Sequence, residues 1–211
     1  MTPKYRLIFF DVDSTLVNIE GIDILGAGNP EVARLTEAAM NGEIPLDQIY
    51  ARRLEMIRPD RAAVEKLSRR YLDSLVEGAD ETIRKLKEAG CVIHFVTAGI
   101  AQAVESLAGK FGVQAHAVRL RFTEDGAYDD FDRGSVLTRP RGKEIVVRDI
   151  RARTKGNAAF IGDGISDLDA KPAVDFFIGF GGVHTRPRVR ENADVFVPGP
   201  RLDAVLPYLS S

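Results

Sequence analysis

The chain has no tryptophan and a single cysteine, Cys91, among its 211 residues. One cysteine excludes both an internal disulfide framework and a zinc site built on cysteine thiolates. No apolar run approaches the roughly 18 residues that a membrane-spanning helix requires. The four apolar residues after Arg6 are too few for the core of a signal peptide. We therefore expect a soluble cytoplasmic protein with no membrane partner.

The chain also lacks a large excess of charge of either sign. Its 29 Lys and Arg residues nearly balance 31 Asp and Glu residues, which gives a formal net charge of −2 at pH 7. This balance argues against nucleic acid as a partner, because dedicated nucleic-acid-binding proteins usually carry a basic excess. The 45% hydrophobic and 28% charged residues are typical of a globular protein.

Five short apolar segments are rich in β-branched or aromatic residues. They are 7–10, 92–96, 158–161, 176–178 and 195–197. Continuous apolar runs of this length are typical of strands that are buried on both faces. Segments with helical periodicity separate them, at 80–89, 101–110 and 144–150. This alternation predicts an α/β fold with a doubly wound, Rossmann-like parallel sheet.

Two segments break the alternation. Residues 18–75 contain no convincing strand and predict a small helical insertion after the first strand, between core segments 1–17 and 76–211. Its helices are expected near 30–40, 46–57 and 60–72. The second segment, His116–Asp132, alternates in polarity up to a turn at Glu124–Gly126 and predicts a β-hairpin.

Polar side chains directly follow three of the apolar segments. Asp11 and Asp13 follow the first and Thr97 follows the second, whereas Asp163 and Asp167 follow the third. Asp and Gly also favour turns, which would explain one such strand end but hardly three. In an open α/β sheet the ligand site lies beyond the carboxyl ends of the strands. We therefore expect these side chains to gather at one edge of the sheet.

Four carboxylates at one edge would repel one another. A pair about 4 Å apart costs about 4 kcal/mol at an effective dielectric constant near 20, whereas domains are stable by only about 5–15 kcal/mol. The cluster thus needs a cation or protonation. Ligands that are all oxygen suit Mg²⁺, which leaves room for a phosphate group. Thr97 could then donate a hydrogen bond to the phosphate, and a lysine could neutralise it.

The spacing of Asp11 and Asp13 suits a two-step reaction. On an extended strand end, residues two apart face the same side. One carboxylate can then attack phosphorus, while the other protonates the leaving oxygen and later activates water. Aspartyl-phosphate chemistry of this kind divides a difficult hydrolysis into two easier steps.

These residues resemble the signature of the haloacid dehalogenase superfamily, which is D-x-D-x-T, then Ser or Thr, then Lys, then G-D-x-x-x-D. Within that superfamily the chain is similar to the phosphoserine phosphatase family through several further segments. They are Phe10–Thr15, Glu20–Asp23, Ala39–Gly42, Arg53–Ile57, Gly162–Gly164 and Phe177–Gly182. The resemblance implies a Mg²⁺-dependent hydrolase that converts O-phosphoserine to serine and phosphate.

The resemblance also implies roles for the core residues. Asp11 would be the nucleophile and Asp13 the general acid and base. The carboxylates of Asp11 and Asp163 and the backbone carbonyl of Asp13 would hold the metal, with Asp167 acting directly or through water. The substrate's phosphate would lie against Thr97, Ala98 and Gly99. The family usually has Ser-Gly-Gly at these three positions, and the threonine keeps the hydroxyl.

In the inserted segment, the resemblance implies a cap that closes over the substrate. Glu20 would meet the substrate ammonium and Arg53 its carboxylate, while Met40 would line the pocket. A small zwitterion requires an anion, a bidentate cation and a lid that excludes water, so these residue types agree with the chemistry. Arg186 is left open between a contact with the phosphate and a structural ion pair.

Two residues compete for the catalytic cation, because the family has Lys-Gly where this chain reads Arg141-Gly142-Lys143. In the family this cation opens a helix with apolar positions three, four and seven residues later. From Lys143 these positions are Val146, Val147 and Ile150. From Arg141 they are Glu144, Ile145 and Arg148. The phase favours Lys143, because a helix that buried Glu144 against the sheet is expected to be unstable.

Other functions remain open. Another small-phosphomonoester phosphatase, or a phosphotransferase that passes phosphate from phosphoserine to another alcohol, would use the same site. A signalling receiver domain also combines an acidic Mg²⁺ site with Asp, Thr and Lys, but it has no cap and no acid/base two residues after its nucleophile. The stereochemical preference for phosphoserine is open, and the protein is expected to be a monomer or a homodimer.

Overall fold

The computed structural model describes residues 2–210, so Met1 and Ser211, the outermost residues of the predicted core segments, lie outside it. Within this range a six-stranded sheet has the order β3-β2-β1-β6-β7-β8, and each neighbouring pair is parallel. The strands are β1 (Leu7–Phe10), β2 (Val92–Ile100), β3 (Gln114–Val118), β6 (Ala158–Gly162), β7 (Phe176–Phe180) and β8 (Val195–Val197). The five predicted strands are thus confirmed.

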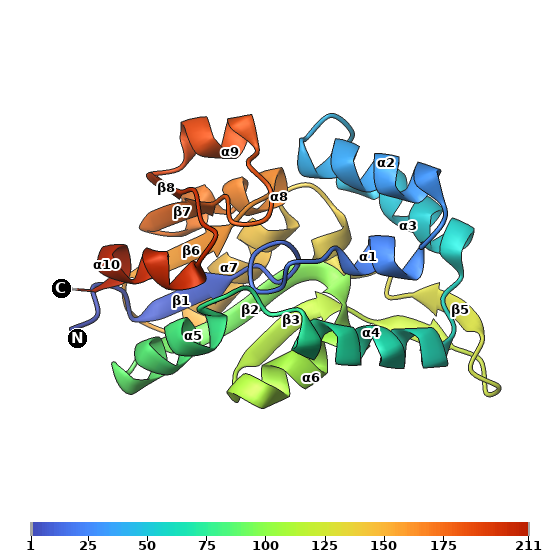
Figure 1. Ribbon diagram of the computed structural model, residues 1–211, viewed down its shortest axis with the longest axis horizontal. Helices are drawn as coiled ribbons and strands as arrows, with labels where there is room; N and C mark the ends of the chain where they lie inside the picture. Colours follow the sequence, from blue (N-terminus) through green and yellow to red (C-terminus); the bar gives the residue numbers. More distant parts are fainter. Residues whose placement is uncertain (1, 211) are drawn as a thin grey trace.

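Helices cover the sheet on both faces, which confirms the doubly wound α/β fold (Figure 1). They are α5 (Ala79–Glu88), α6 (Ala101–Phe111), α7 (Gly142–Arg153), α8 (Ile165–Leu168), α9 (Pro187–Asn192) and α10 (Leu206–Leu209). Short 3₁₀ helices lie at Val136–Thr138, Lys171–Ala173 and Leu202–Val205. Across residues 2–210, each helix is too short or too polar to cross a membrane.

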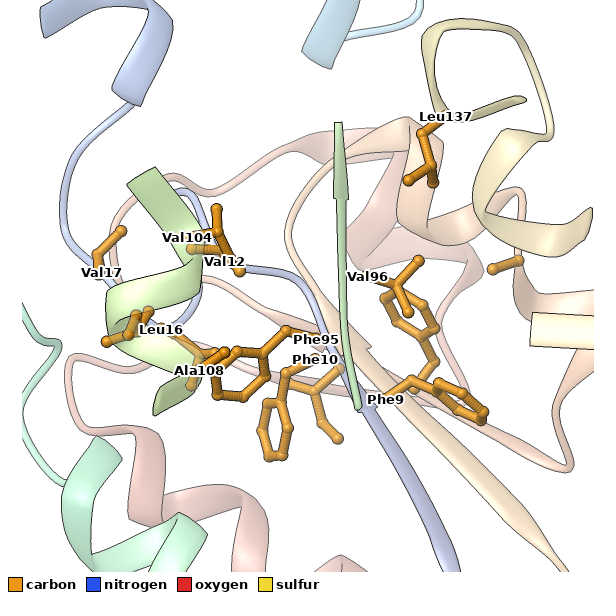
Figure 2. Close-up of a cluster of buried hydrophobic side chains, with 14 of the residues drawn as sticks. Phe9, Phe10, Val12, Leu16, Val17, Phe95, Val96, Val104, Ala108 and Leu137 are labelled. Atoms are coloured by element: carbon orange, nitrogen blue, oxygen red, sulfur yellow. The ribbon is translucent and has the colours of Figure 1, made fainter. Parts of the chain in front are cut away.

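Burial on both faces explains why the strands read as continuous apolar runs. In Figure 2, Phe10 of β1 lies on the same side as Val104 of α6, whereas Phe9 and Val96 lie on the opposite side, together with Leu137. All five side chains are buried. Successive residues of a central strand therefore face two different apolar layers, so most positions on both faces are apolar.

Residues 18–75 fold into helices whose two ends meet beside β1. The helices are α1 (Gly21–Leu25), α2 (Pro30–Met40), α3 (Leu46–Ile57) and α4 (Arg61–Asp73). Val17 bridges Leu75, and the Asn18 amide donates to the Ser74 carbonyl at 2.8 Å. In Figure 1, α2 and α3 stand apart from the sheet, while α4 runs along α6. The three predicted helices are confirmed and α1 is additional, whereas the division into two domains stays a prediction.

The prediction of a hairpin over His116–Asp132 was partly wrong. Strand β3 belongs to the main sheet, where it is the edge strand beside β2. Only β4 (Leu120–Phe122) and β5 (Tyr128–Phe131) form an antiparallel hairpin. An edge strand alternates between buried and exposed side chains just as a hairpin strand does, so polarity alone could not separate the two.

Strand β2 is longer than predicted, and its end is irregular. It was expected to stop at Val96 but continues to Ile100. Val96 pairs with His116 and Ile100 pairs with Val118, so four residue steps along β2 match two along β3. This irregularity bends the segment Thr97–Gly99 out of regular pairing, at the edge where the predicted site lies.

Candidate active site

The candidate site lies at the carboxyl end of β1, which β2 and β6 flank on opposite sides. This is the point at which the order of strands reverses, where ligands bind in open α/β sheets. A single pocket there contains predicted residues from the strand ends and from the insertion. They are Asp11, Asp13, Glu20, Met40, Arg53, Thr97, Ala98, Gly99 and Lys143. The pocket therefore joins segments that are far apart in sequence.

Three buried carboxylates form a cluster that reaches the pocket through Asp11. Asp11, Asp163 and Asp167 each present an oxygen, and these oxygens lie within 4.8 Å of one another. The turn after β6 shapes the cluster, because the Gly164 amide donates to Asp167 Oδ2 at 2.9 Å. A Cβ atom on Gly162 would lie 2.3 Å from Asp167 Cγ, so only glycine permits this approach.

Lys143 lies within the carboxylate cluster. Its Nζ is 2.7 Å from Asp11 Oδ1 and donates to Asp167 Oδ1 at 2.5 Å. Burial lowers the pKa of Lys143, but the carboxylates of Asp11 and Asp167 outweigh burial and raise that pKa above its usual value. The ammonium is therefore charged at neutral pH. The competing candidate, Arg141, has a side chain that is 66% exposed and lies outside the pocket.

The helix-phase argument for Lys143 rested partly on a wrong expectation about Glu144. Val147 and Ile150 are buried as expected and Val146 is half-buried, and the 50% exposure of Ile145 also fits the phase from Lys143. Glu144, however, is buried too. Glu144 is tolerated because it accepts hydrogen bonds from Arg141 at 2.6 Å and from Arg148 at 2.9 Å. Two guanidinium partners compensate the desolvation of the carboxylate, which the apolar pattern alone could not reveal.

The carboxylate cluster fits a divalent cation. Burial, followed by the charge of Asp11, raises the pKa of Asp163 to about 7, even though Arg186 and Lys143 lie nearby. Burial and the charge of Asp11 likewise raise the pKa of Asp167 well above its usual value. The three carboxylates share two cations, Lys143 and Arg186, so a metal ion would stabilise the negative charge that remains. Their donors are all oxygen, which suits a hard cation such as Mg²⁺.

Asp13 lies beside this cluster and is held by the inserted segment. Its Oδ1 accepts hydrogen bonds from the Gly21 amide and from the Tyr71 hydroxyl, both at 2.7 Å. Burial and the charge of Asp11 raise the pKa of Asp13 to about 6. The sequence did not reveal Tyr71 as a site residue, because its position in α4 is typical of an ordinary core residue and it is 58 residues from Asp13.

The predicted phosphate-binding segment adjoins Asp13. Thr97 is buried, and its Oγ1 accepts a hydrogen bond from the Gly99 amide at 2.9 Å. The Ala98 carbonyl accepts a hydrogen bond from the Tyr50 hydroxyl of α3 at 2.9 Å. The irregular end of β2 is therefore tied both to itself and to the inserted helices.

Arg53 is a buried cation with an unused donor. It is 4% exposed, and its Nη1 donates to Thr36 Oγ1 at 3.0 Å. Thr36 in turn donates to Asp23 Oδ1 at 2.6 Å. The Nε of Arg53 has no hydrogen-bond partner among the described residues. A buried guanidinium that lacks a carboxylate partner provides a binding position for a ligand anion.

Glu20 brings a further carboxyl group to the same pocket. It accepts a hydrogen bond from Ser14 Oγ at 2.5 Å, and Ser14 itself has a left-handed backbone with φ of 55°. Burial and the charges of Asp13 and Asp163 raise the pKa of Glu20 well above its usual value. A ligand ammonium beside Glu20 would favour the charged form of this carboxyl group. Met40 also lines this part of the pocket.

Arg186 forms a structural connection between the core and α2. It is 4% exposed, and its Nε donates to Asp163 Oδ2 at 3.2 Å. Its Nη1 donates to Asn41 Oδ1 at 3.0 Å and to Glu37 Oε1 at 3.3 Å. Arg186 is not among the pocket-lining residues. Of the two readings left open by the sequence, the ion pair is the one observed.

Comparison with known proteins identifies the class. The family model for haloacid dehalogenase-like hydrolases matches residues 5–174, and the chain belongs to this family. The resemblance noted in the sequence is thereby confirmed.

Relatives with a more specific description match nearly the whole chain. A phosphoserine phosphatase from Bos taurus is 32% identical, over 90% of this chain and 88% of the relative. A solved structure of a phospho-aspartyl intermediate analogue of phosphoserine phosphatase is 31% identical, with a TM-score of 0.86 over 98% of this chain and 99% of that chain. A substrate-bound phosphoserine phosphatase complex is 30% identical, with the same TM-score and coverage.

Proposed function

We propose that this protein is a Mg²⁺-dependent phosphoserine phosphatase that works through an aspartyl-phosphate intermediate. The observation that carries the proposal is the pairing of two features in one pocket. A buried carboxylate cluster with its own lysine adjoins a buried, partly unpaired Arg53 and the carboxyl of Glu20. The similarity to phosphoserine phosphatases over nearly the whole chain supports the same substrate.

The core residues would carry out the reaction in two steps. A carboxylate oxygen of Asp11 attacks phosphorus while the bond from phosphorus to the serine oxygen breaks, and Asp13 gives a proton to that oxygen. Asp13 then takes a proton from the water that attacks the aspartyl phosphate, which releases phosphate and restores Asp11. Lys143, 2.7 Å from Asp11 Oδ1, stabilises the charge on the transferring phosphoryl group.

The carboxylates of Asp11, Asp163 and Asp167 and the backbone carbonyl of Asp13 would hold the Mg²⁺. When bound, the ion withdraws negative charge from the phosphoryl oxygens. The Thr97 hydroxyl would donate a hydrogen bond to the same oxygens, with Ala98 next to it at the substrate site. The Gly99 amide, which donates to Thr97 Oγ1 in this structure, would donate to those oxygens instead when the substrate binds. These donors lie on the irregular end of β2, beside Asp13.

The inserted residues would recognise the amino-acid part of the substrate. Arg53, through its free Nε, binds the carboxylate, and Glu20 accepts a hydrogen bond from the ammonium. Met40 covers the substrate and limits the access of water. In this proposal residues 18–75 are a cap domain on a core formed by 1–17 and 76–211. A cytoplasmic location and a monomeric or homodimeric state stay predictions.

Phosphate release from a panel of phosphomonoesters tests the function. We expect O-phosphoserine to be hydrolysed with the highest kcat/KM, and activity to disappear on chelation of Mg²⁺ and return when it is added back. A neutral sugar phosphate preferred over phosphoserine would contradict the proposal. If the protein were a phosphotransferase, added alcohols would accept the phosphoryl group in place of water, and new phosphate esters would form.

A further inference from the structure

The two oxygens of Asp13 lie in different surroundings. Oδ1 accepts hydrogen bonds from the Gly21 amide and from the Tyr71 hydroxyl, each at 2.7 Å. Both donors belong to the helices inserted after β1, and Tyr71 is fully buried in α4. These two bonds fix the plane of the carboxyl group, because they hold one of its oxygens from two directions.

The second oxygen of Asp13 faces the predicted phosphate-binding segment. A Cβ atom on Gly99 would lie 2.9 Å from Asp13 Oδ2 and 3.2 Å from Thr97 Oγ1. Oδ2 and the Thr97 hydroxyl therefore flank the same small space, which exists because residue 99 has no side chain. Any phosphomonoester bound by Thr97 and the Gly99 amide would lie close to Oδ2.

We propose that Tyr71 is a positioning residue for proton transfer by Asp13. By occupying Oδ1 together with the Gly21 amide, it leaves Oδ2 to carry the proton. As the bond from Asp11 to phosphorus forms and the bond to the ester oxygen breaks, the proton on Oδ2 passes to that oxygen. The products are a free alcohol, an aspartyl phosphate and the Asp13 carboxylate. This inference rests on the role of Asp13 in the proposed function.

Packing alone does not explain the Tyr71 hydroxyl. Helix α4 is held in place by its contacts with α6 and by buried side chains that include Val64 and Leu67. The hydroxyl is aimed at the pocket and bonds to the carboxyl of Asp13. A Cβ atom on Gly21 would lie 2.1 Å from the Tyr71 oxygen, so the absence of a side chain at residue 21 is what admits the hydroxyl.

The dependence of rate on the leaving group tests this role. We would measure kcat/KM of Tyr71→Phe with Mg²⁺ on a series of aryl phosphates whose phenols differ in acidity. Departure of p-nitrophenolate needs little help from an acid, so we expect a loss below about twofold. For the least acidic phenol, which needs the proton most, we expect a loss of about tenfold. A plot of log kcat/KM against the pKa of the leaving phenol should therefore have a steeper slope for Tyr71→Phe than for the wild type.

Two further variants test whether the steeper slope comes from the loss of the hydrogen bond between Tyr71 and Asp13. Tyr128→Phe is the matched control, because Tyr128 is also buried and its hydroxyl has no partner among the described residues. It should keep the wild-type slope. Gly21→Ala pushes the Tyr71 hydroxyl away from Asp13 without removing it, and it should steepen the slope as Tyr71→Phe does. Thermal melting of each variant establishes that it is folded.

A loss of the same size for every aryl phosphate would overturn the inference, because it would show that Tyr71 only supports the structure of the pocket. Failure of the wild type on phosphoserine would instead overturn the proposed substrate. The two outcomes are distinguishable, since aryl phosphates carry no amino-acid group and do not depend on Arg53 or Glu20.

Discussion

The two sides of the pocket differ in how their charges are matched. On the side of the strand ends, Lys143 contacts both Asp11 and Asp167, and Arg186 contacts Asp163. These groups occupy their positions through contacts within the protein itself. Their arrangement is thus preorganised for chemistry at a phosphoryl group, whatever alcohol that group is attached to.

On the side of the inserted helices, Arg53 and Glu20 form no ion pair with any residue from 2 to 210. Arg53 donates to the neutral Thr36, and Glu20 accepts from the neutral Ser14. Burying charges in this way is costly unless a ligand brings the missing partners. The comparison teaches that the strand ends serve the reaction, whereas the insertion serves recognition of one class of substrate. Each of the following experiments separates these two roles.

The largest effect is expected at the strand ends. Asp11→Asn should abolish turnover of phosphoserine and of aryl phosphates alike, because an amide does not attack phosphorus and brings no negative charge to the metal. The measurement is phosphate release by the purified variant, with a search for phosphorylated protein by mass spectrometry. A rate similar to that of the wild type would contradict the covalent mechanism.

Asp13→Asn should lower kcat for phosphoserine by about 10²–10⁴-fold, as loss of a general acid and base typically does. Binding of Mg²⁺ should be largely retained, because the contact of this residue with the metal is expected through its backbone carbonyl. Calorimetric titration of Mg²⁺ into the variant checks this. Loss of metal binding together with activity would assign the Asp13 side chain to the metal site.

Lys143→Ala should lower turnover by at least about 10²-fold, because it removes a main electrostatic stabiliser of the transferring group. The loss should be similar for phosphoserine and for p-nitrophenyl phosphate. Arg141→Ala is the matched control, since Arg141 is two residues away and its exposed side chain pairs with Glu144. It should stay within several-fold of the wild type, because Arg141 lies outside the pocket and Arg148 still donates to the buried Glu144 at 2.9 Å. The reverse order would transfer the cationic role to Arg141.

Substitutions on the recognition side should have smaller effects on activity, and these effects should depend on the substrate. Arg53→Ala and Glu20→Gln each remove a charge-assisted contact of about 1.5–3 kcal/mol, which corresponds to a loss of about 10–150-fold in kcat/KM for phosphoserine. Hydrolysis of p-nitrophenyl phosphate should change only a few-fold. If both substrates lose activity equally, these residues maintain the structure of the insertion and do not read the amino acid.

Much of the fold could be predicted because it follows from local patterns. Strand β1 was located from its continuous apolar run, and the helix over Leu46–Ile57 from the glycine and proline residues that flank it. The prediction was weaker at the sheet edge, where β3 was assigned to a hairpin, and at the end of β2. At both places the outcome depends on which strand lies alongside, and a single segment does not carry that information.

The sequence by itself determined which chemical groups stand at the strand ends, because the period of a strand and the turn that follows it are local properties. It therefore placed Asp11, Asp13 and Asp163 at one edge of the sheet. Only the tertiary structure decided that Tyr71 reaches Asp13 and that Arg186 joins Asp163 to α2. Those contacts arise where segments distant in sequence pack together, and their energy depends on a burial that no local pattern specifies.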